Sequence, residues 1–267
     1  MKKTILITGA TDGIGLEAAK LLASNGHDLL IHGRNVEKLN SVKNLLAAIP
    51  NAGSIKGYLA DFSVFSDVTK LVNNIKNEHK NLDVLINNAG VFKSNNSMTP
   101  EGLDVRFVVN TVSPYILAQE LLHLLGNSGR IINLSSAAQS PVNILALLGK
   151  VKLSDMEAYA QSKLAITMWS KVLAEKFGEK GPTIIAVNPG SLLASKMVKE
   201  GFGVEGQDLS IGAEILKRMA LEESVSQHSG QYFDNDSGQF SQPHPDGLNL
   251  KKSEEVVEAI EIIMNKG

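Results

Sequence analysis

Short apolar runs alternate with amphipathic segments along almost the whole chain, and this alternation limits the possible folds more than any other feature. The runs consist mostly of Ile, Leu and Val without a polar face, which is typical of strands buried on both sides of a sheet. The segments between them repeat apolar residues at helical spacing. Alternating strands and helices favour the α/β class, so the sequence predicts a doubly wound parallel sheet of about seven strands with helices on both faces.

The expected elements follow from these periods. Strands are expected at 4–8, 29–32, 54–60, 84–86, 130–134, 183–187 and 231–233. Helices are expected at 13–24, 36–49, 64–79, 101–125, 155–177 and 253–264, with a kink at Pro114. Two stretches, 137–154 and 191–208, show no regular period, and irregular segments of that length are usually functional or mobile. We find no linker or internal repeat, and 267 residues fit one α/β domain.

Composition excludes several classes of function. The net charge is −2 and the basic residues are dispersed, so no nucleic-acid partner is expected. The absence of cysteine excludes disulfides and thiol nucleophiles, and the six histidines lack the spacing of metal ligands, so we expect no metal. No apolar run reaches the length of about 18 residues that a membrane span needs. The first expected strand begins at residue 4, so we expect no signal peptide and a cytoplasmic protein.

A glycine-rich turn, Thr-Gly-Ala-Thr-Asp-Gly-Ile-Gly over residues 8–15, joins the first expected strand to the first expected helix. Its glycines allow the backbone to approach a ligand closely, and the helix N-terminus offers free N–H groups to a pyrophosphate. A plain strand-to-helix turn is the alternative, but the position at the first junction favours a dinucleotide. The residues expected to contact the dinucleotide here are Gly9, Thr11, Asp12, Gly13, Ile14 and Gly15.

The glycine turn and the motifs that follow it resemble those of the short-chain dehydrogenase/reductase family. In chain order these motifs are Asp61, Asn87-Asn88-Ala89-Gly90, Asn110, Ser135-Ser136, Tyr159 with Lys163, and Asn188-Pro189-Gly190. The resemblance implies a single-domain Rossmann fold over 1–267, in which 1–136 mainly bind the cofactor and 137–154 and 191–230 form substrate-side loops. It also implies cofactor contacts from Asp61, Phe62, Asn88, Ala89, Gly90, Pro189 and Gly190.

The end of the second expected strand indicates which nicotinamide cofactor is used. An NAD enzyme places an acidic residue there to bind the ribose hydroxyls, whereas this chain has Gly33 followed by Arg34. Arg34 offers a guanidinium fork suited to a 2′-phosphate, and Lys38 one helical turn later could assist. A solvated Arg34 is the alternative, and Asp12 adds an opposing negative charge. The sequence therefore predicts NADP(H) in preference to NAD(H).

Tyr159 and Lys163 are four positions apart, so they share one face of the expected helix. A phenol with an ordinary pKa of about 10 is a poor base at neutral pH, and an adjacent ammonium would lower that pKa. The pair suits Tyr159 as general acid/base and Lys163 as its electrostatic partner. The resemblance implies that Lys163 also holds the nicotinamide ribose, that Ser136 binds the substrate oxygen and that Asn110 completes a proton relay. Ser135 competes with Ser136, and a structural role for Asn110 at a helix bend is nearly as plausible.

Two departures from the family pattern concern the substrate side. Ser136 and Tyr159 are 23 positions apart (159 − 136), about twice the usual family spacing. This insertion resembles the subgroup that contains retinol dehydrogenases and a WW-domain oxidoreductase. Where the family often has a Thr that contacts the nicotinamide, this chain has Ala194, so either Ser195 replaces that contact or the contact is missing.

The sequence thus predicts an NADP(H)-dependent oxidoreductase that acts on a small-molecule carbonyl or alcohol. Apolar residues in 137–154 and 191–208 favour a lipophilic substrate, unless they merely pack these loops onto the sheet. A homo-oligomer, dimer or tetramer, is expected because the helices at 101–125 and 155–177 form dimer faces in relatives. A catalytically silent dinucleotide-binding regulator of the same fold is the other hypothesis, and the presence of both Tyr159 and Lys163 disfavours it.

Overall fold

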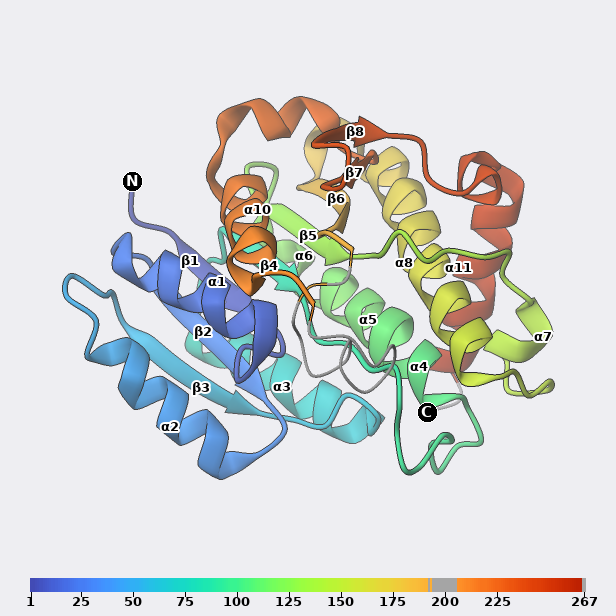
Figure 1. The fold of residues 1–267 in the computed structure, drawn as a ribbon, viewed down its shortest axis with the longest axis horizontal. Helices are drawn as coiled ribbons and strands as arrows, with labels where there is room; N and C mark the ends of the chain where they lie inside the picture. The colour runs from blue at the N-terminus through green and yellow to red at the C-terminus, as the bar shows by residue number, and fades with distance from the viewer. Residues whose placement is uncertain (192, 194–205, 266–267) are drawn as a thin grey trace.

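One mainly parallel sheet forms the centre of the molecule. The computed structural model describes residues 1–191, 193 and 206–265, and in these the strands run in the order β3-β2-β1-β4-β5-β6-β7-β8 (Figure 1). The antiparallel edge strand β8 is the one that the predicted set of about seven strands lacked. The strands are β1 Thr4–Ile7, β2 Asp28–Gly33, β3 Ile55–Leu59, β4 Val84–Asn87, β5 Arg130–Leu134, β6 Thr183–Asn188, β7 Tyr232–Asp234 and β8 Gln239–Ser241.

Helices cover both faces of the sheet, as the alternating sequence pattern predicted. Successive strand residues point to opposite faces, so Ile5 and Ile7 belong to one core cluster and Leu6 to the other. The first cluster includes side chains of α1 (Gly13–Ser24), α2 (Val36–Ala47) and α10 (Leu209–Leu221). The second includes α3 (Phe65–Glu78), α5 (Ser113–Glu120), α8 (Asp155–Phe177) and α11 (Leu250–Met264). The doubly wound fold is therefore confirmed.

The single helix expected over 101–125 is divided into several pieces. It begins only at α4 (Val105–Phe107), passes through a π-helical turn over Val108–Val112 (η1), and continues as α5 and α6 (Leu122–Leu125). Pro114 explains the irregular turn, because it has no N–H to donate to the carbonyl of Asn110 four residues earlier. The prediction of a kink at Pro114 located the irregularity correctly.

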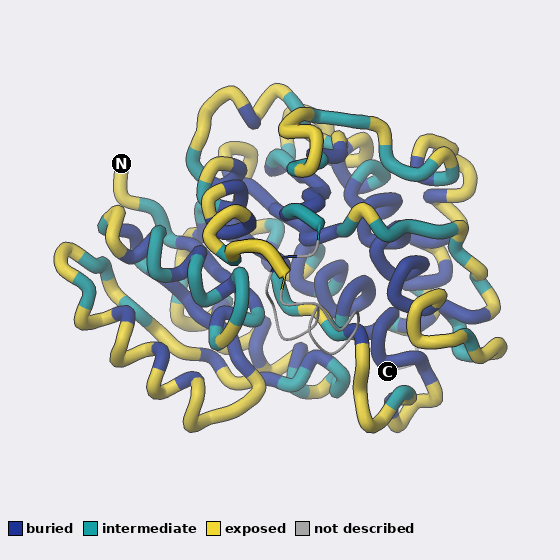
Figure 2. Tube along the Cα trace, viewed as in Figure 1, coloured by how far each residue is buried: buried dark blue, intermediate teal, exposed yellow. Residues whose placement is uncertain are grey.

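Helix α8 is buried on all sides over 158–170 (Figure 2). One side packs on β5 and β6, and α11 packs along another. The hydroxyl of Tyr115 on α5 donates a hydrogen bond of 3.0 Å to Glu261 of α11, which ties the same layer together. The helix that carries the expected catalytic pair is therefore held rigidly between the sheet and the C-terminal helix.

Two segments that were expected to be irregular or loop contain helices, one within 137–154 and one within 191–230. Within 137–154 a short helix, α7 (Ile144–Leu147), packs against α11 and buries Leu147 completely. Within 191–230, which was expected to be loop, α10 packs against α1 on the face away from α8. Short 3₁₀ turns complete the chain at Gly178–Lys180, Glu223–His228 and Pro245–Leu248. Among the described residues, no helix is both long enough and apolar enough to span a bilayer.

Candidate active site

The glycine turn lies between β1 and α1, at the carboxyl end of the sheet. Gly9 and Gly13 have φ of +65° and +55°, in the left-handed region that side chains disfavour. A Cβ at Gly9 would lie 2.8 Å from Cα of Ala89, and a Cβ at Gly15 would lie 2.3 Å from Nδ2 of Asn88. Two of the predicted cofactor motifs therefore meet at van der Waals contact, and glycine is required for that approach.

Asn88 fixes the shape of this turn. Its side-chain amide donates to the carbonyls of Thr8 (2.8 Å) and Gly9 (3.1 Å). The Thr8 hydroxyl in turn accepts from the backbone N–H groups of Asn88 and Ala89, each at 3.0 Å. The Asn88-Ala89-Gly90 segment thus braces the glycine turn from the end of β4.

His32 is a part of the site that the sequence analysis missed. Its Nδ1 accepts from the Gly9 N–H at 3.1 Å, so the hydrogen is on Nε2, which donates to the Ala60 carbonyl at 3.0 Å. The ring also stacks on Phe62 with centroids 4.1 Å apart. Burial lowers the pKa of His32 to about 4, so the ring is neutral at physiological pH. A histidine within a strand that was expected to be buried was the available signal.

The ribose end of the expected cofactor site carries the charges predicted from the sequence, but they are paired differently. Arg34 is exposed and forms no ion pair among the described residues. Lys38, expected to assist it, instead lies 3.5 Å from Asp12, so the negative charge of Asp12 is offset locally. A Cβ at Gly33 would lie 2.5 Å from Cγ2 of Thr11, so the end of β2 also contacts the glycine turn closely.

The geometry of these residues fits a dinucleotide. Asp12 caps α1 by accepting from the Gly13 N–H, whereas the N–H groups of Ile14 and Gly15 donate to no acceptor among the described residues. Such free donors at a helix N-terminus bind phosphate oxygens. Across β2, the Asp61 carboxylate holds the backbone N–H and hydroxyl of Ser63 at 2.9 and 2.7 Å, which fixes its orientation beside Phe62.

Tyr159 and Lys163 lie on the same side of α8, at the carboxyl end of β5. The Lys163 ammonium donates to the Leu134 carbonyl at 2.7 Å and lies 5.7 Å from the centre of the Tyr159 ring. Both side chains are buried, at 9% and 4% exposed. The structure therefore brings the two residues together, as the four-residue spacing predicted.

The pKa of the Tyr159 phenol differs from the expectation based on sequence. Burial raises this pKa above its ordinary value, and a hydrogen bond with Ser136 acts in the opposite direction more weakly. Burial also lowers the pKa of Lys163 to about 8. The sequence argument considered the adjacent ammonium alone, whereas desolvation disfavours the charged form of both groups.

The two serines after β5 face different partners. The Ser135 hydroxyl donates to the Lys163 carbonyl at 2.8 Å and shares a hydrogen bond of 2.7 Å with Thr167, so it is engaged with the body of α8. Ser136 is less buried and its hydroxyl faces Tyr159. The Tyr232 hydroxyl donates to the Ser136 carbonyl at 3.1 Å and helps to fix this residue. The contacts favour Ser136 as the residue available to a substrate.

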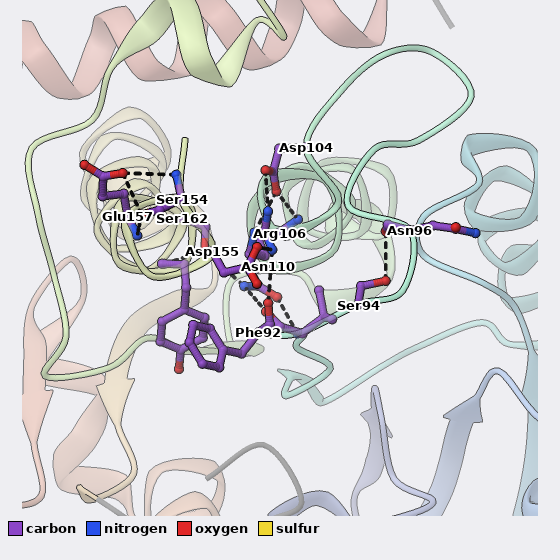
Figure 3. Close-up of polar contacts among 12 residues, drawn as sticks. Phe92, Ser94, Asn96, Asp104, Arg106, Asn110, Ser154, Asp155, Glu157 and Ser162 are labelled. Atoms are coloured by element: carbon purple, nitrogen blue, oxygen red, sulfur yellow. Dashed lines mark hydrogen bonds and ion pairs between the residues drawn. The ribbon is translucent and has the colours of Figure 1, made fainter. Parts of the chain in front are cut away.

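Asn110 has a clear structural role in the π-helical turn. Its side chain accepts from the Val91 N–H at 2.8 Å and donates to the Val91 carbonyl at 3.0 Å (Figure 3). The same amide donates to the Ser162 hydroxyl, which itself donates to the Tyr159 carbonyl. The side chain is thus fully used in joining η1, α8 and the segment after β4, and the proton relay that the resemblance implies stays a prediction.

Pro189 and Gly190 follow β6 and are held by the β7–β8 turn. The Asn235 amide donates to the Pro189 carbonyl at 2.9 Å, and Asn188 donates to Asp234 and Asp236 at 2.8 and 2.9 Å. The sequence analysis missed this acidic turn, because its residues follow the Pro-Gly motif by more than 40 positions. Ser195, the expected substitute for the nicotinamide-contacting Thr, lies outside the described residues.

A match to a protein-family model identifies the family of this chain. Residues 3–203 match the model of the short chain dehydrogenases. The chain belongs to this family. It is an NAD(P)-dependent oxidoreductase of the short-chain dehydrogenase/reductase kind, as the order of its motifs predicted.

Several relatives of this short-chain dehydrogenase are similar over most of their length. Mouse retinol dehydrogenase 12 is 32% identical over 251 residues, covering 86% of this chain and 77% of the relative. The short-chain dehydrogenase chry4 of Gibberella zeae is 31% identical and covers 96% of this chain and 95% of its own. A crystal structure of a short chain dehydrogenase from Burkholderia cenocepacia in complex with NADP superposes with a TM-score of 0.71 at 26% identity, covering 87% and 95% of the two chains. The likeness to retinol dehydrogenases that the insertion indicated is thereby confirmed.

Proposed function

We propose that this short-chain dehydrogenase is an NADP(H)-dependent carbonyl reductase or alcohol dehydrogenase with Tyr159 as its general acid/base. The observation that carries the proposal is the buried Tyr159–Lys163 pair beside Ser136, at the same sheet edge as the glycine turn. Residues 1–136 would form mainly the cofactor half of the domain, and 137–154 with 191–230 its substrate side. Nicotinamide, when bound, supplies or accepts the hydride.

The protein's own groups handle the proton and the substrate oxygen. Ser136 holds the oxygen of the substrate by donating a hydrogen bond, which stabilises negative charge that develops there. Tyr159 transfers its phenolic proton to that oxygen in reduction and removes it in oxidation. Because burial raises the pKa of Tyr159, the phenol is protonated at neutral pH, and this state suits the reduction of a carbonyl. The Lys163 ammonium steadies the phenolate that forms in that step.

The cofactor preference rests on Arg34 at the end of β2. The exposed guanidinium is free to receive a 2′-phosphate, while Lys38 neutralises Asp12 beside it. Asp61 and Phe62 would border the adenine, and Asn88, Ala89 and Gly90 the cleft. Pro189 and Gly190 would approach the nicotinamide end. The NADP complex of the Burkholderia cenocepacia enzyme supports this preference by analogy.

We further propose a lipophilic substrate. The similarity to retinol dehydrogenases supports it, as does the Phe92 ring, which packs edge-on against the Tyr159 ring at 5.2 Å between centroids. Leu147 does not contribute, because the insertion buries it in the core beneath α11, where it only packs the loop. The residues after 193 that were expected to complete the pocket roof lie outside the described residues.

Turnover of a carbonyl series tests this function. The wild-type enzyme is assayed with NADPH and with NADH on aldehydes and ketones of rising chain length and ring number, beside Tyr159→Phe. We expect kcat/KM to rise with the apolar size of the substrate. The activation free energy should fall by roughly 1 kcal/mol for every few added methylenes. Tyr159→Phe should bind NADPH normally and lose nearly all turnover, since it removes only the phenolic hydroxyl that carries the transferable proton.

Two results would contradict parts of the proposal separately. Wild-type kcat in Tyr159→Phe on any accepted carbonyl would exclude Tyr159 as the acid/base. A flat series, or a preference for charged carbonyls, would exclude the lipophilic substrate while leaving the chemistry intact. Ser135→Ala serves as a control for Ser136→Ala, because the structure engages Ser135 with α8, whereas Ser136 is only partly buried and its hydroxyl faces Tyr159.

A further inference from the structure

A buried cation lies close to the catalytic helix and takes no part in the proposed chemistry. Arg106 on α4 is 1% exposed, and Figure 3 shows its guanidinium between three segments. Its Nε and Nη2 donate to the two carboxylate oxygens of Asp104 at 2.9 and 2.7 Å. Its Nη1 donates to the Asp155 carboxylate at 2.7 Å and to the Phe92 carbonyl at 3.2 Å.

Such an arrangement is not needed merely to stabilise a fold. Desolvation of a guanidinium costs several kcal/mol, and apolar side chains of the same volume often replace buried ion pairs without loss of stability. What the fork adds is direction, because its N–H groups fix the relative positions of the groups that accept from them. The residues that Arg106 joins therefore indicate what it orients.

The first of these groups is the start of the catalytic helix. Asp155 is the first residue of α8, and Tyr159 and Lys163 follow it at intervals of four residues on the same side. Asp155 is half exposed, and Arg106 is buried. Their ion pair holds the first turn of α8 against α4. The position of that turn determines the position of Tyr159, which lies one turn further along α8.

The second group is the segment that supports the Tyr159 ring. The Phe92 ring meets the Tyr159 ring edge to face at 5.2 Å, and the Phe92 carbonyl is the one that Arg106 holds. The preceding residue, Val91, is bonded through both backbone groups to Asn110. Arg106 and Asn110 lie four residues apart on α4 and η1, so one helical segment fixes 91–92 at two points.

We propose that Arg106 is a positioning residue that orients the Tyr159 phenol, acting through Asp155 on one side and Phe92 on the other. The inference rests on the proposed role of Tyr159 as acid/base. Its side-chain hydrogen bonds go to Asp104, Asp155 and Phe92 and to none of the residues assigned to the cofactor. Its effect is to keep the Tyr159 phenol directed at Ser136. Misplacement of a reacting group by about 1 Å can cost a hundredfold in rate, so loss of the fork should be measurable.

The four tyrosines of the chain allow a test that does not depend on the substrate. Protein labelled with ¹³C at the tyrosine ζ carbon gives one signal for each, and Tyr159→Phe assigns the signal of interest. We compare the NADP⁺-bound wild type, Arg106→Lys and Asp155→Asn across a pH titration. We expect the Tyr159 signal and its apparent pKa to change in both variants, while Tyr58, Tyr115 and Tyr232 keep theirs. On an accepted carbonyl, kcat should fall about tenfold in Arg106→Lys with KM for NADPH unchanged.

A matched control is Arg218→Lys, because Arg218 also pairs with a carboxylate and lies over an aromatic ring, 5.4 Å from the centre of Phe233. This control should leave the Tyr159 signal in place. Movement of all four tyrosine signals together, or of none, would overturn the inference. If Arg106→Lys does not fold, Asp155→Asn decides alone, since it leaves the Asp104 pair intact. Wild-type turnover in Tyr159→Phe would remove the proposed function instead, whatever the Arg106 variant does.

Discussion

A single side chain, Arg34, carries the expected choice between the two nicotinamide dinucleotides. It is exposed and unpaired among the described residues, so a 2′-phosphate would meet no competing carboxylate. Arg34→Asp should raise the dissociation constant for NADPH about ten- to a hundredfold, the usual value of a charge-assisted contact, and should favour NADH. Binding of both cofactors is measured by fluorescence titration.

Lys38→Ala is the matched control for Arg34→Asp. Because Lys38 is paired with Asp12, its removal should cost NADPH binding less than the Arg34 substitution does. Equal dissociation constants for NADPH and NADH in the unmodified protein would contradict the preference.

His32 makes the stability of the protein depend on pH. Its ordinary pKa of about 6.5 applies to the unfolded chain, whereas burial lowers the folded value to about 4. Between these values the unfolded chain binds a proton that the folded protein does not, so the free energy of unfolding falls as the pH falls. From pH 7 to pH 5 this residue should account for a loss of about 2 kcal/mol.

Urea denaturation of wild type and His32→Gln at both pH values measures this contribution. Glutamine keeps a donor and an acceptor for Gly9 and Ala60 but does not titrate. The burial of His27 and His79 lowers their pKa values too, so the comparison between variant and wild type isolates His32. An identical loss of stability in both proteins would show that the ring is not buried neutral.

Local sequence spacing could predict some site residues and not others. Tyr159 and Lys163 could be paired from the sequence, because residues four positions apart on a helix lie on the same side whatever surrounds them. The roles of His32 and Arg106 could not be predicted, because they depend on partners such as Ala60 and Asp155 that only the tertiary fold brings near. The direction of the Tyr159 pKa shift was missed for the same reason, since burial cannot be read from neighbours in the chain.

At the level of elements, the glycine turn and the Asn88 segment form one unit. Gly15→Ala should disrupt this unit, because its Cβ would lie 2.3 Å from the Asn88 amide and 2.4 Å from the Gly9 carbonyl. We expect a lower melting temperature and a loss of NADPH affinity of tenfold or more, about 1.4 kcal/mol. Calorimetry and cofactor titration measure the two effects.

Gly57→Ala is the control for this element. On β3 an added Cβ meets only the flexible side chain of Leu39 at 3.3 Å, so cofactor affinity should not change. If Gly15→Ala bound NADPH as the wild type does, the close approach of Asn88 to the turn would not be needed for the cofactor.

Sequence periodicity predicted best the helices and strands whose apolar spacing continues without interruption from end to end. The helices at 13–24 and 155–177 and the strand at 130–134 were placed to the residue. The helix at 101–125 was not, because the π-helical turn before Pro114 breaks the period without changing the composition. Helix α10 was overlooked because it directly follows an irregular stretch, and the three-residue β8 is too short for its period to be seen.

At the scale of the whole molecule, α11 changes which surfaces are available to a second copy of the chain. The sequence predicted a homo-oligomer through the helices at 101–125 and 155–177. In the structure α11 packs along α8, so 158–170 are buried within the protomer, and Glu261 bonds to Tyr115 of α5. The outward side of α11 is charged, with Lys251, Lys252, Glu254, Glu255 and Glu258 exposed. Charged residues of this kind are depleted from the centres of stable interfaces.

We therefore expect light scattering to give the mass of one chain, 28.6 kDa, at micromolar concentration. The packing of α11 over α8 can be tested by substitution. Ile260 on α11 is fully buried in the core shared with α8, so Ile260→Asp should release the helix and expose apolar surface that self-associates. Ile262→Asp is the control, because Ile262 is 45% exposed and should leave the mass unchanged. If the wild type were a dimer and Ile262→Asp dissociated it, the outer side of α11 would itself be the interface. That result would contradict our inference that α11 covers α8 and faces solvent.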